Sequence, residues 1–189
     1  AKVAAEVGPA TSGVSIPANA VYSAAGLVQV SPSSTDPTYT LKSNKTPKGS
    51  VSSYRVVATD AQQGPAMAKY MLNKGVKTIA IIDDSTQYGK GLADQVEQSM
   101  KAAGTTVVAR EATTDKTSDF KALLTKIKGM NPDYIFWGGM DDTGATLVKQ
   151  LKELGLTSQF AGADGICTSK FMELSGAAGK GAICSQAGM

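Results

Sequence analysis

Two short apolar runs near the start of the chain each lead into a loop of small hydroxyl residues. Residues 3–7 run into Gly-Pro-Ala-Thr-Ser-Gly at 8–13, and residues 27–30 run into Ser-Pro-Ser-Ser-Thr at 31–35. A strand followed by such a loop and a helix presents hydroxyls and free backbone N–H groups, and open α/β sheets bind small anions such as carboxylates there. The two loops therefore predict one polar, anion-binding pocket built from both.

The other candidates for chemistry carry weaker signals. Tyr-Gly-Lys-Gly at 88–91 lacks the Gly-x-x-x-x-Gly-Lys-Ser/Thr spacing that wraps a phosphate, and no Gly-x-Gly-x-x-Gly follows a predicted strand. The acidic pairs at 83–84 and 141–142 stand at strand ends, where adjacent side chains diverge, so we expect helix-capping or hinge roles for them. The sequence has no histidine, which excludes His-based triads and imidazole zinc sites. An α/β enzyme that uses a lysine or a carboxylate remains an alternative, but no motif favours it, and we predict no enzyme activity, cofactor or metal.

The composition is that of an ordinary globular protein of 189 residues, with 42% hydrophobic and 19% charged residues. The formal net charge of +3 comes mainly from lysines scattered along the chain, which favours a solvated surface over a nucleic-acid patch. No apolar run is long enough to span a membrane, and neither a signal peptide nor an initiating Met is visible, so we expect a processed or excised chain. The only two cysteines, Cys167 and Cys184, could be buried thiols or a disulfide.

From residue 53 onward, apolar runs alternate with amphipathic segments. The run at 78–83 is continuously apolar, as expected of a buried parallel strand, and the helix predicted at 62–74 is expected to bury Met67, Tyr70 and Met71 on one face. Strands that alternate with helices of this length predict an α/β fold with a doubly wound parallel sheet. The predicted strands lie at 53–58, 78–83, 105–110, 133–137, 159–162 and 182–184, and the other helices at 92–103, from about 118, at 145–154 and around 171–174.

The first 52 residues are organised differently. They hold the two strand–loop units, one helix at 16–25 and a polar stretch at 36–52 that we interpret as a loop or lobe connection. Two strands and one helix cannot close a core, so this segment either joins the second sheet or belongs to a lobe that is present only in part.

Loops at the carboxyl ends of the predicted strands should line one edge of a doubly wound sheet, which is the usual ligand crevice. These loops lie at 10–13, 33–35, 85–88, 138–140 and 163–165. Their hydroxyls and backbone N–H groups suit a carboxylate, and Asp164 suits an ammonium group. A pocket with both kinds of group indicates an amino-acid binding site.

Six motifs along the chain stand in the order found in a known family. They are Val-Gly-Pro-Ala-Thr-Ser-Gly (7–13), Val-Ser-Pro-Ser-Ser-Thr (30–35), Arg-Val-Val with Asp-Ala-Gln-Gln-Gly-Pro (55–65), Gln-Tyr-Gly-Lys-Gly (87–91), Trp-Gly-Gly (137–139) and Gly-Ala-Asp-Gly (162–165). Over essentially the whole chain they resemble the branched-chain (leucine/isoleucine/valine) amino-acid binding proteins of ABC transporters, which are type I periplasmic binding proteins. In that family two α/β lobes hold an amino acid and deliver it to a membrane permease. The resemblance implies a periplasmic protein with a small amino-acid ligand, no enzyme activity and no nucleic-acid partner.

The resemblance also assigns roles to individual residues. The hydroxyl residues expected around the ligand's α-carboxylate are Ser12, Ser33 and Thr35, with Ser34 beside them. Tyr88 would close over the ligand, and Asp164 would pair with the α-ammonium. Ala10 and Met140 would line the pocket for the ligand's side chain. Because the family is exported, the resemblance implies a disulfide between Cys167 and Cys184.

Members of this family are longer than this chain, so we expect a fragment with a partial first lobe (1–57) and a nearly complete second lobe (58–189). We therefore expect weaker ligand binding than in an intact relative, and an oligomer or swapped dimer becomes possible. The alternative reading is a ligand-sensing domain of the same fold, which would need a signalling partner instead of a permease.

Overall fold

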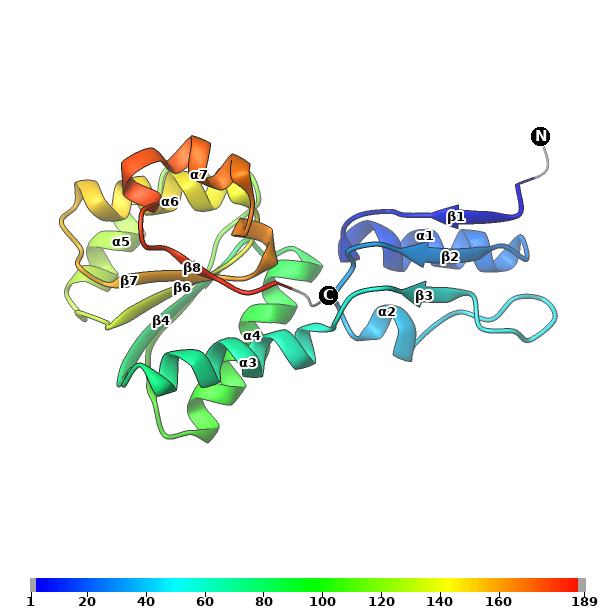
Figure 1. Cartoon of the computed structure of the whole chain (residues 1–189), viewed down its shortest axis with the longest axis horizontal. Helices are drawn as coiled ribbons and strands as arrows, with labels where there is room; N and C mark the ends of the chain where they lie inside the picture. Colours follow the sequence, from blue (N-terminus) through cyan, green and yellow to red (C-terminus); the bar gives the residue numbers. More distant parts are fainter. Residues whose placement is uncertain (1–2, 187–189) are drawn as a thin grey trace. The chain divides into compact units, whose positions relative to one another are not determined.

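The computed structural model of the chain describes residues 3–186. These residues fall into two compact units, the first within Ala1–Gln62 and the second within Gln63–Gln186, and each unit has a parallel β-sheet of its own (Figure 1). The first segment therefore does not join the second sheet. The expectation that all strand-end loops line one edge of a single sheet is wrong, because the loops are divided between two sheets.

The first unit contains a three-stranded sheet and two helices. Its elements are β1 (Ala5–Val7), α1 (Ser12–Ala24), β2 (Val28–Ser31), α2 (Thr38–Leu41) and β3 (Ser53–Arg55), and the strand order is β1-β2-β3. Helix α1 begins earlier than predicted, because its first turns bury the hydroxyls of Ser12 and Ser15 instead of apolar side chains. The polar stretch at 36–52 is not all loop: the Asp36 carboxylate accepts from the Thr38 backbone N–H over 2.7 Å and holds the start of α2.

The second unit contains a five-stranded sheet in the order β5-β4-β6-β7-β8. Its strands are β4 (Thr78–Asp83), β5 (Thr106–Ala112), β6 (Tyr134–Gly138), β7 (Gln159–Gly162) and β8 (Ile183–Cys184). Its helices are α3 (Asp60–Asn73, whose first turn lies in the first unit), α4 (Gln87–Ala102), α5 (Lys121–Lys128), α6 (Asp141–Glu153) and α7 (Ser169–Ser175), with 3-10 turns η1 (Asp164–Ile166) and η2 (Gly176–Gly179). All strand pairs are parallel, as predicted, and β4 and β7 have the predicted bounds.

Two apolar cores cover the two faces of the second sheet. Alternate residues of a strand point to opposite faces, so Ala80 and Ile82 pack with α5, α6 and α7, whereas Ile79 and Ile81 pack with α3 and α4. Figure 1 shows these helices on opposite sides of the sheet. This is the doubly wound α/β arrangement that the alternating pattern predicts, and its continuous apolar strands are the consequence of burial on both faces.

Some details of the predicted helices are wrong. Met67 and Met71 are buried, but Tyr70 is 42% exposed because it stands at the border of the apolar stripe of α3. Helix α4 begins at Gln87 because Thr86 caps it, accepting from the Gly89 backbone N–H over 2.9 Å. The glycines of its first turn conceal this start from an analysis of apolar periodicity.

Candidate functional site

The second sheet reverses its winding at β4. The chain passes from β4 to β5 on one side and then to β6 on the other. In open α/β sheets, ligands bind outside the carboxyl ends of the strands at such a switch point. The predicted residues Tyr88, Met140 and Asp164 follow β4, β6 and β7 at this edge.

Tyr88 and Asp164 come from distant parts of the sequence and are in direct contact. Tyr88 lies in the first turn of α4 and is 4% exposed, and Asp164 opens the turn η1 after β7. The Tyr88 hydroxyl donates to Asp164 Oδ1 over 2.8 Å and accepts from the Gly165 backbone N–H over 2.8 Å. One hydroxyl therefore holds both the carboxylate and the backbone of the turn.

The environment of Asp164 disfavours an uncompensated negative charge. Burial raises the pKa of its carboxyl, and the hydrogen bond from Tyr88 lowers it in part. The buried Gln63 side chain on α3 also lowers this pKa, although its geometry falls short of a full hydrogen bond among residues 3–186. A partly desolvated carboxylate of this kind favours a cationic partner such as an ammonium group. Gln63 belongs to one of the six motifs, but no periodicity marked it as a site residue.

Glycines allow the segments of this edge to approach closely. A Cβ on Gly165 would lie 2.5 Å from the carbonyl oxygen of Gly139 and 2.9 Å from the Tyr88 hydroxyl oxygen. A Cβ on Gly139 would lie 2.5 Å from the Trp137 ring and 2.9 Å from the Asp84 carboxylate. Neither position has room for a side chain, so both glycines are required by the packing of the edge.

Asp84 and Met140 frame the same edge. Asp84 is 1% exposed, and its Oδ1 accepts from the backbone N–H and hydroxyl of Thr86, the residue that caps α4, over 3.0 and 2.6 Å. Burial raises the pKa of Asp84. The Met140 carbonyl accepts from the Trp137 indole N–H over 3.1 Å, and the Met140 side chain packs against the core on the α3–α4 face.

Arg110 forms a charged cluster that the sequence analysis missed. Its guanidinium binds Asp83 at the end of β4, Asp94 over 2.8 Å and Glu97 over 3.2 Å. Asp83 also accepts from the Ser85 backbone N–H over 2.7 Å. The four side chains tie β5 to β4 and α4. No spacing rule could connect Arg110 to these partners, because they meet only after the strands pair.

The two hydroxyl loops of the first unit lie next to each other, as the sequence predicts. The Ser33 hydroxyl donates to the carbonyl of Ala10 over 2.5 Å, and the Ser31 hydroxyl donates to the carbonyl of Pro9 over 2.9 Å. The Ser12 hydroxyl accepts from the Asp36 backbone N–H over 3.1 Å. These contacts join the loop before α1 to the loop after β2.

The hydroxyl protons of this unit are not equally available. Ser15 donates to Pro9 over 3.0 Å, so in its 2.6 Å contact with Ser34 it is Ser34 that donates. Ser33 and Ser34 therefore already donate their hydroxyl protons to acceptors within the first unit. Within residues 3–186, Ser12 donates to no partner, and the buried Thr35 hydroxyl makes no hydrogen bond. Ser12 and Thr35 are thus the two predicted residues that retain a proton for an anion.

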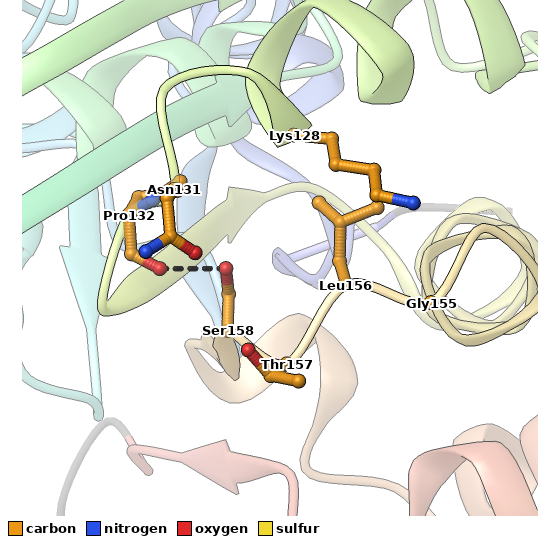
Figure 2. Close-up of a pocket in the computed structure, with 7 residues that line it drawn as sticks. All are labelled: Lys128, Asn131, Pro132, Gly155, Leu156, Thr157 and Ser158. Atoms are coloured by element: carbon orange, nitrogen blue, oxygen red, sulfur yellow. Dashed lines mark hydrogen bonds between the residues drawn. The ribbon is translucent and has the colours of Figure 1, made fainter.

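A small cavity lies at the opposite end of the second sheet, where β6 and β7 begin. Its volume is about 190 Å³, and Figure 2 shows its lining, which comes from the segments 128–132 and 155–158. The Ser158 hydroxyl donates to the Pro132 carbonyl over 2.6 Å, and the Lys128 ammonium donates to the Leu154 carbonyl over 2.7 Å. Its polar groups therefore serve the local fold, and none of the seven lining residues drawn is acidic.

Cys167 and Cys184 form a disulfide, with Cα atoms 5.5 Å apart. This agrees with the pairing implied by the resemblance. Among residues 3–186 no group of three or more His, Cys, Asp or Glu side chains is placed to hold a metal ion. In the same part of the chain, no helix combines the length and apolar character needed to cross a membrane.

The second unit is a doubly wound α/β domain with charged groups at the carboxyl edge of its sheet, and comparison with known proteins gives its family. The sequence profile of the family described as periplasmic binding protein matches residues 1–189. The chain is 34% identical over 179 residues to Leu/Ile/Val-binding protein homolog 1 of Brucella abortus, covering 94% of this chain and 46% of the relative. It is 36% identical over 182 residues to Leu/Ile/Val-binding protein BraC3 of Rhizobium johnstonii, covering 96% and 48%. The chain belongs to the periplasmic binding protein family.

Solved structures support the same conclusion. The substrate-binding protein LivJ of Streptococcus pneumoniae, in complex with isoleucine, matches with a TM-score of 0.80 and 30% identity over 91% of this chain and 47% of LivJ. The leucine-binding protein LivK of Thermotoga maritima matches with a TM-score of 0.85 and 28% identity over 93% of this chain and 49% of LivK. These matches confirm the predicted type I fold. The chain spans about half the length of the curated relatives it matches.

Proposed function

We propose that this chain is part of a substrate-binding protein of an ABC transporter that binds a branched-chain or other small amino acid and passes it to a membrane permease. The names of the relatives, Leu/Ile/Val-binding proteins, support the ligand class. The family description supports a periplasmic location. We propose ligand binding without a catalytic step, with lobes at 1–57 and 58–189.

The observation that carries this proposal is the partly buried Asp164 carboxylate, oriented by Tyr88 at the switch point of the second sheet. Such a carboxylate suits the α-ammonium of an amino acid, because a charge-assisted hydrogen bond offsets the cost of its burial. Tyr88 holds Asp164 in this role and contributes its ring to the same edge.

We assign the α-carboxylate of the ligand to the hydroxyl loops of the first unit. Ser12 and Thr35 are the preferred donors because, within residues 3–186, neither hydroxyl donates a hydrogen bond. In this assignment Ser33 and Ser34 mainly hold the loops in place. Ala10 and Met140 would line the pocket for the apolar side chain.

Calorimetric titration of the 189-residue chain tests the proposal with three compounds. Leucine carries both charges, 4-methylpentanoate lacks the ammonium, and 3-methylbutylamine lacks the carboxylate. We expect leucine to bind most tightly, although more weakly than to a full-length relative. Failure to bind leucine at millimolar concentration, or equal binding of all three compounds, would contradict the proposal.

The substitution Asp164→Asn separates the two ends of the ligand. Loss of a charge-assisted contact worth about 1.5–3 kcal/mol should weaken leucine binding about tenfold or more. Binding of 4-methylpentanoate should not change. Asp115→Asn, the same replacement at an exposed position, is the matched control and should leave both titrations unchanged.

A further inference from the structure

The disulfide lies next to the turn that carries Asp164, and the structure gives it two connections to that turn. Cys167 directly follows η1, and its backbone N–H donates to the Asp164 carbonyl over 3.0 Å. Its partner Cys184 pairs in register with Gly162, the last residue of β7. Cys184 therefore holds both ends of the segment 162–167, one by strand pairing and the other by a covalent bond.

The strand that contributes Cys184 is weakly anchored by itself. Strand β8 has two residues, lies at the edge of the sheet and pairs only with β7 among the described strands. Short edge strands of this kind open easily, because few backbone hydrogen bonds and little buried surface hold them. The disulfide couples this strand to the turn, so that neither can move without the other.

The η1 turn is tightly packed around Ile166. Ile166 is 2% exposed, and its side chain approaches Gly162 and Gly144 so closely that a Cβ on either glycine would lie 2.6 or 3.1 Å from it. The Tyr88 hydroxyl also holds the Asp164 carboxylate and the Gly165 N–H by hydrogen bonds. A small displacement at Cys167 would thus be transmitted to the Asp164 carboxylate through a single helical turn.

We propose that the Cys167–Cys184 disulfide is a positioning element for Asp164, which keeps the η1 turn in the conformation that places its carboxylate for a ligand ammonium group. Without the bond, the turn would spend part of its time detached from Tyr88. This inference rests on the proposed function for its consequence in ligand binding, but not for its consequence in the turn itself.

The test compares the native chain with the C167S/C184S variant by two kinds of measurement. Hydrogen exchange of the Gly165 amide, which is bonded to Tyr88, needs no ligand and should become about tenfold faster or more in the variant. Leucine binding should weaken about tenfold, because only the fraction with an ordered turn is competent. Binding of 4-methylpentanoate, which has no ammonium, should stay the same.

Leu124→Ala is the matched control for a general loss of stability. Leu124 is fully buried on α5 in the apolar core of the same unit. This variant should unfold more easily but keep the native exchange rate at Gly165 under conditions where local opening dominates. If the serine pair does not fold, C167A/C184V replaces it, because Cys184 packs against this core and valine retains apolar contact.

The outcomes distinguish the two proposals. Unchanged Gly165 exchange without the disulfide overturns the positioning role, whatever the titrations show. Faster exchange together with absent leucine binding in the native chain supports the positioning role and contradicts the proposed function. An equal loss of leucine and 4-methylpentanoate binding would show a merely structural bond and overturn the inference.

Discussion

Replacing Tyr88 by phenylalanine removes one hydroxyl and keeps the buried ring. That hydroxyl donates to Asp164 over 2.8 Å and accepts from the Gly165 N–H over 2.8 Å. A hydrogen bond to a charged group contributes about 1.5–3 kcal/mol, and the partial exposure of Asp164 and Gly165 lets water replace some of it. We therefore expect Tyr88→Phe to lower the free energy of unfolding by about 2 kcal/mol at pH 7, as measured by urea denaturation.

The pH dependence makes this prediction specific. The pKa of Asp164 is raised by burial above its ordinary 3.8, so its favourable contribution to stability is present below 3.8 and is lost as pH rises through the folded-state pKa. Tyr88 favours the ionised form, and its loss should raise that pKa further. The cost of Tyr88→Phe should therefore be larger at pH 7 than at pH 3.5, where Asp164 is mostly protonated in the unfolded chain.

The same variant should also weaken leucine binding about tenfold, equivalent to about 1.4 kcal/mol, and leave 4-methylpentanoate binding unchanged. Titration of the Asp164 carboxyl by NMR would follow the pKa directly. Equal costs at both pH values, with an unchanged Asp164 pKa, would refute the reasoning about this contact.

Three further substitutions test other contacts of the second unit. Gly165→Ala should destabilise the protein by about 1–3 kcal/mol and weaken leucine binding, because the new Cβ would lie 2.5 Å from the Gly139 carbonyl oxygen; native-like unfolding and titration curves would contradict this. Burial raises the pKa of Asp84 above its ordinary 3.8, so ionisation of this carboxyl lowers the stability of the native chain as pH rises. Asp84→Asn removes that ionisation, and the variant should therefore gain stability relative to the native chain as pH rises from below 3.8. A pH-independent difference would argue against the burial effect. Arg110→Met should cost about 2 kcal/mol, because the buried Asp83 carboxylate loses its guanidinium partner. The additional change Asp83→Asn should restore part of the loss, and strictly additive effects in this double-mutant cycle would contradict the coupling.

The parts of the fold that the sequence predicts are those governed by burial on both faces. Residues 78–83 and 159–162 are strands with the predicted bounds, because a parallel strand between two helical layers is buried on both faces and its central residues are apolar. Helix starts were missed where polar side chains, rather than apolar contacts, occupy the first turn: Thr86 caps α4, and the first turns of α1 bury Ser12 and Ser15. Such features involve one or two polar residues and leave no periodic signal.

In the candidate site, too, some features could be predicted from the sequence and others depend on contacts in the folded chain. Asp164 was predicted from its charge and its place in a strand-end loop, and the role of Tyr88 came from the family resemblance. Their direct contact was not predicted, since no rule of spacing connects residues that are 76 positions apart. The glycines at 139 and 165 are explained only by close approach in the folded chain. The difference between Ser12 and Ser33 as donors also needs the structure, because it depends on which carbonyl each hydroxyl meets.

The first unit departs most from the usual pattern of burial. The residues paired across its sheet place Val7, Val30 and Tyr54 on one face, where Val7 is 82% and Tyr54 is 47% exposed. The opposite face, which α1 covers in Figure 1, buries polar side chains such as Gln29 and Ser53. Each buried hydrogen bond contributes only about 0.5–1.5 kcal/mol net, so this interior stabilises the unit much less than an apolar core of equal size would. The hydroxyl loops assigned to the ligand carboxylate thus lie on the unit that we expect to be less stable. Holding this unit in its ordered form costs free energy, which reduces the net free energy of binding. For this reason we expect the chain to bind its amino acid weakly.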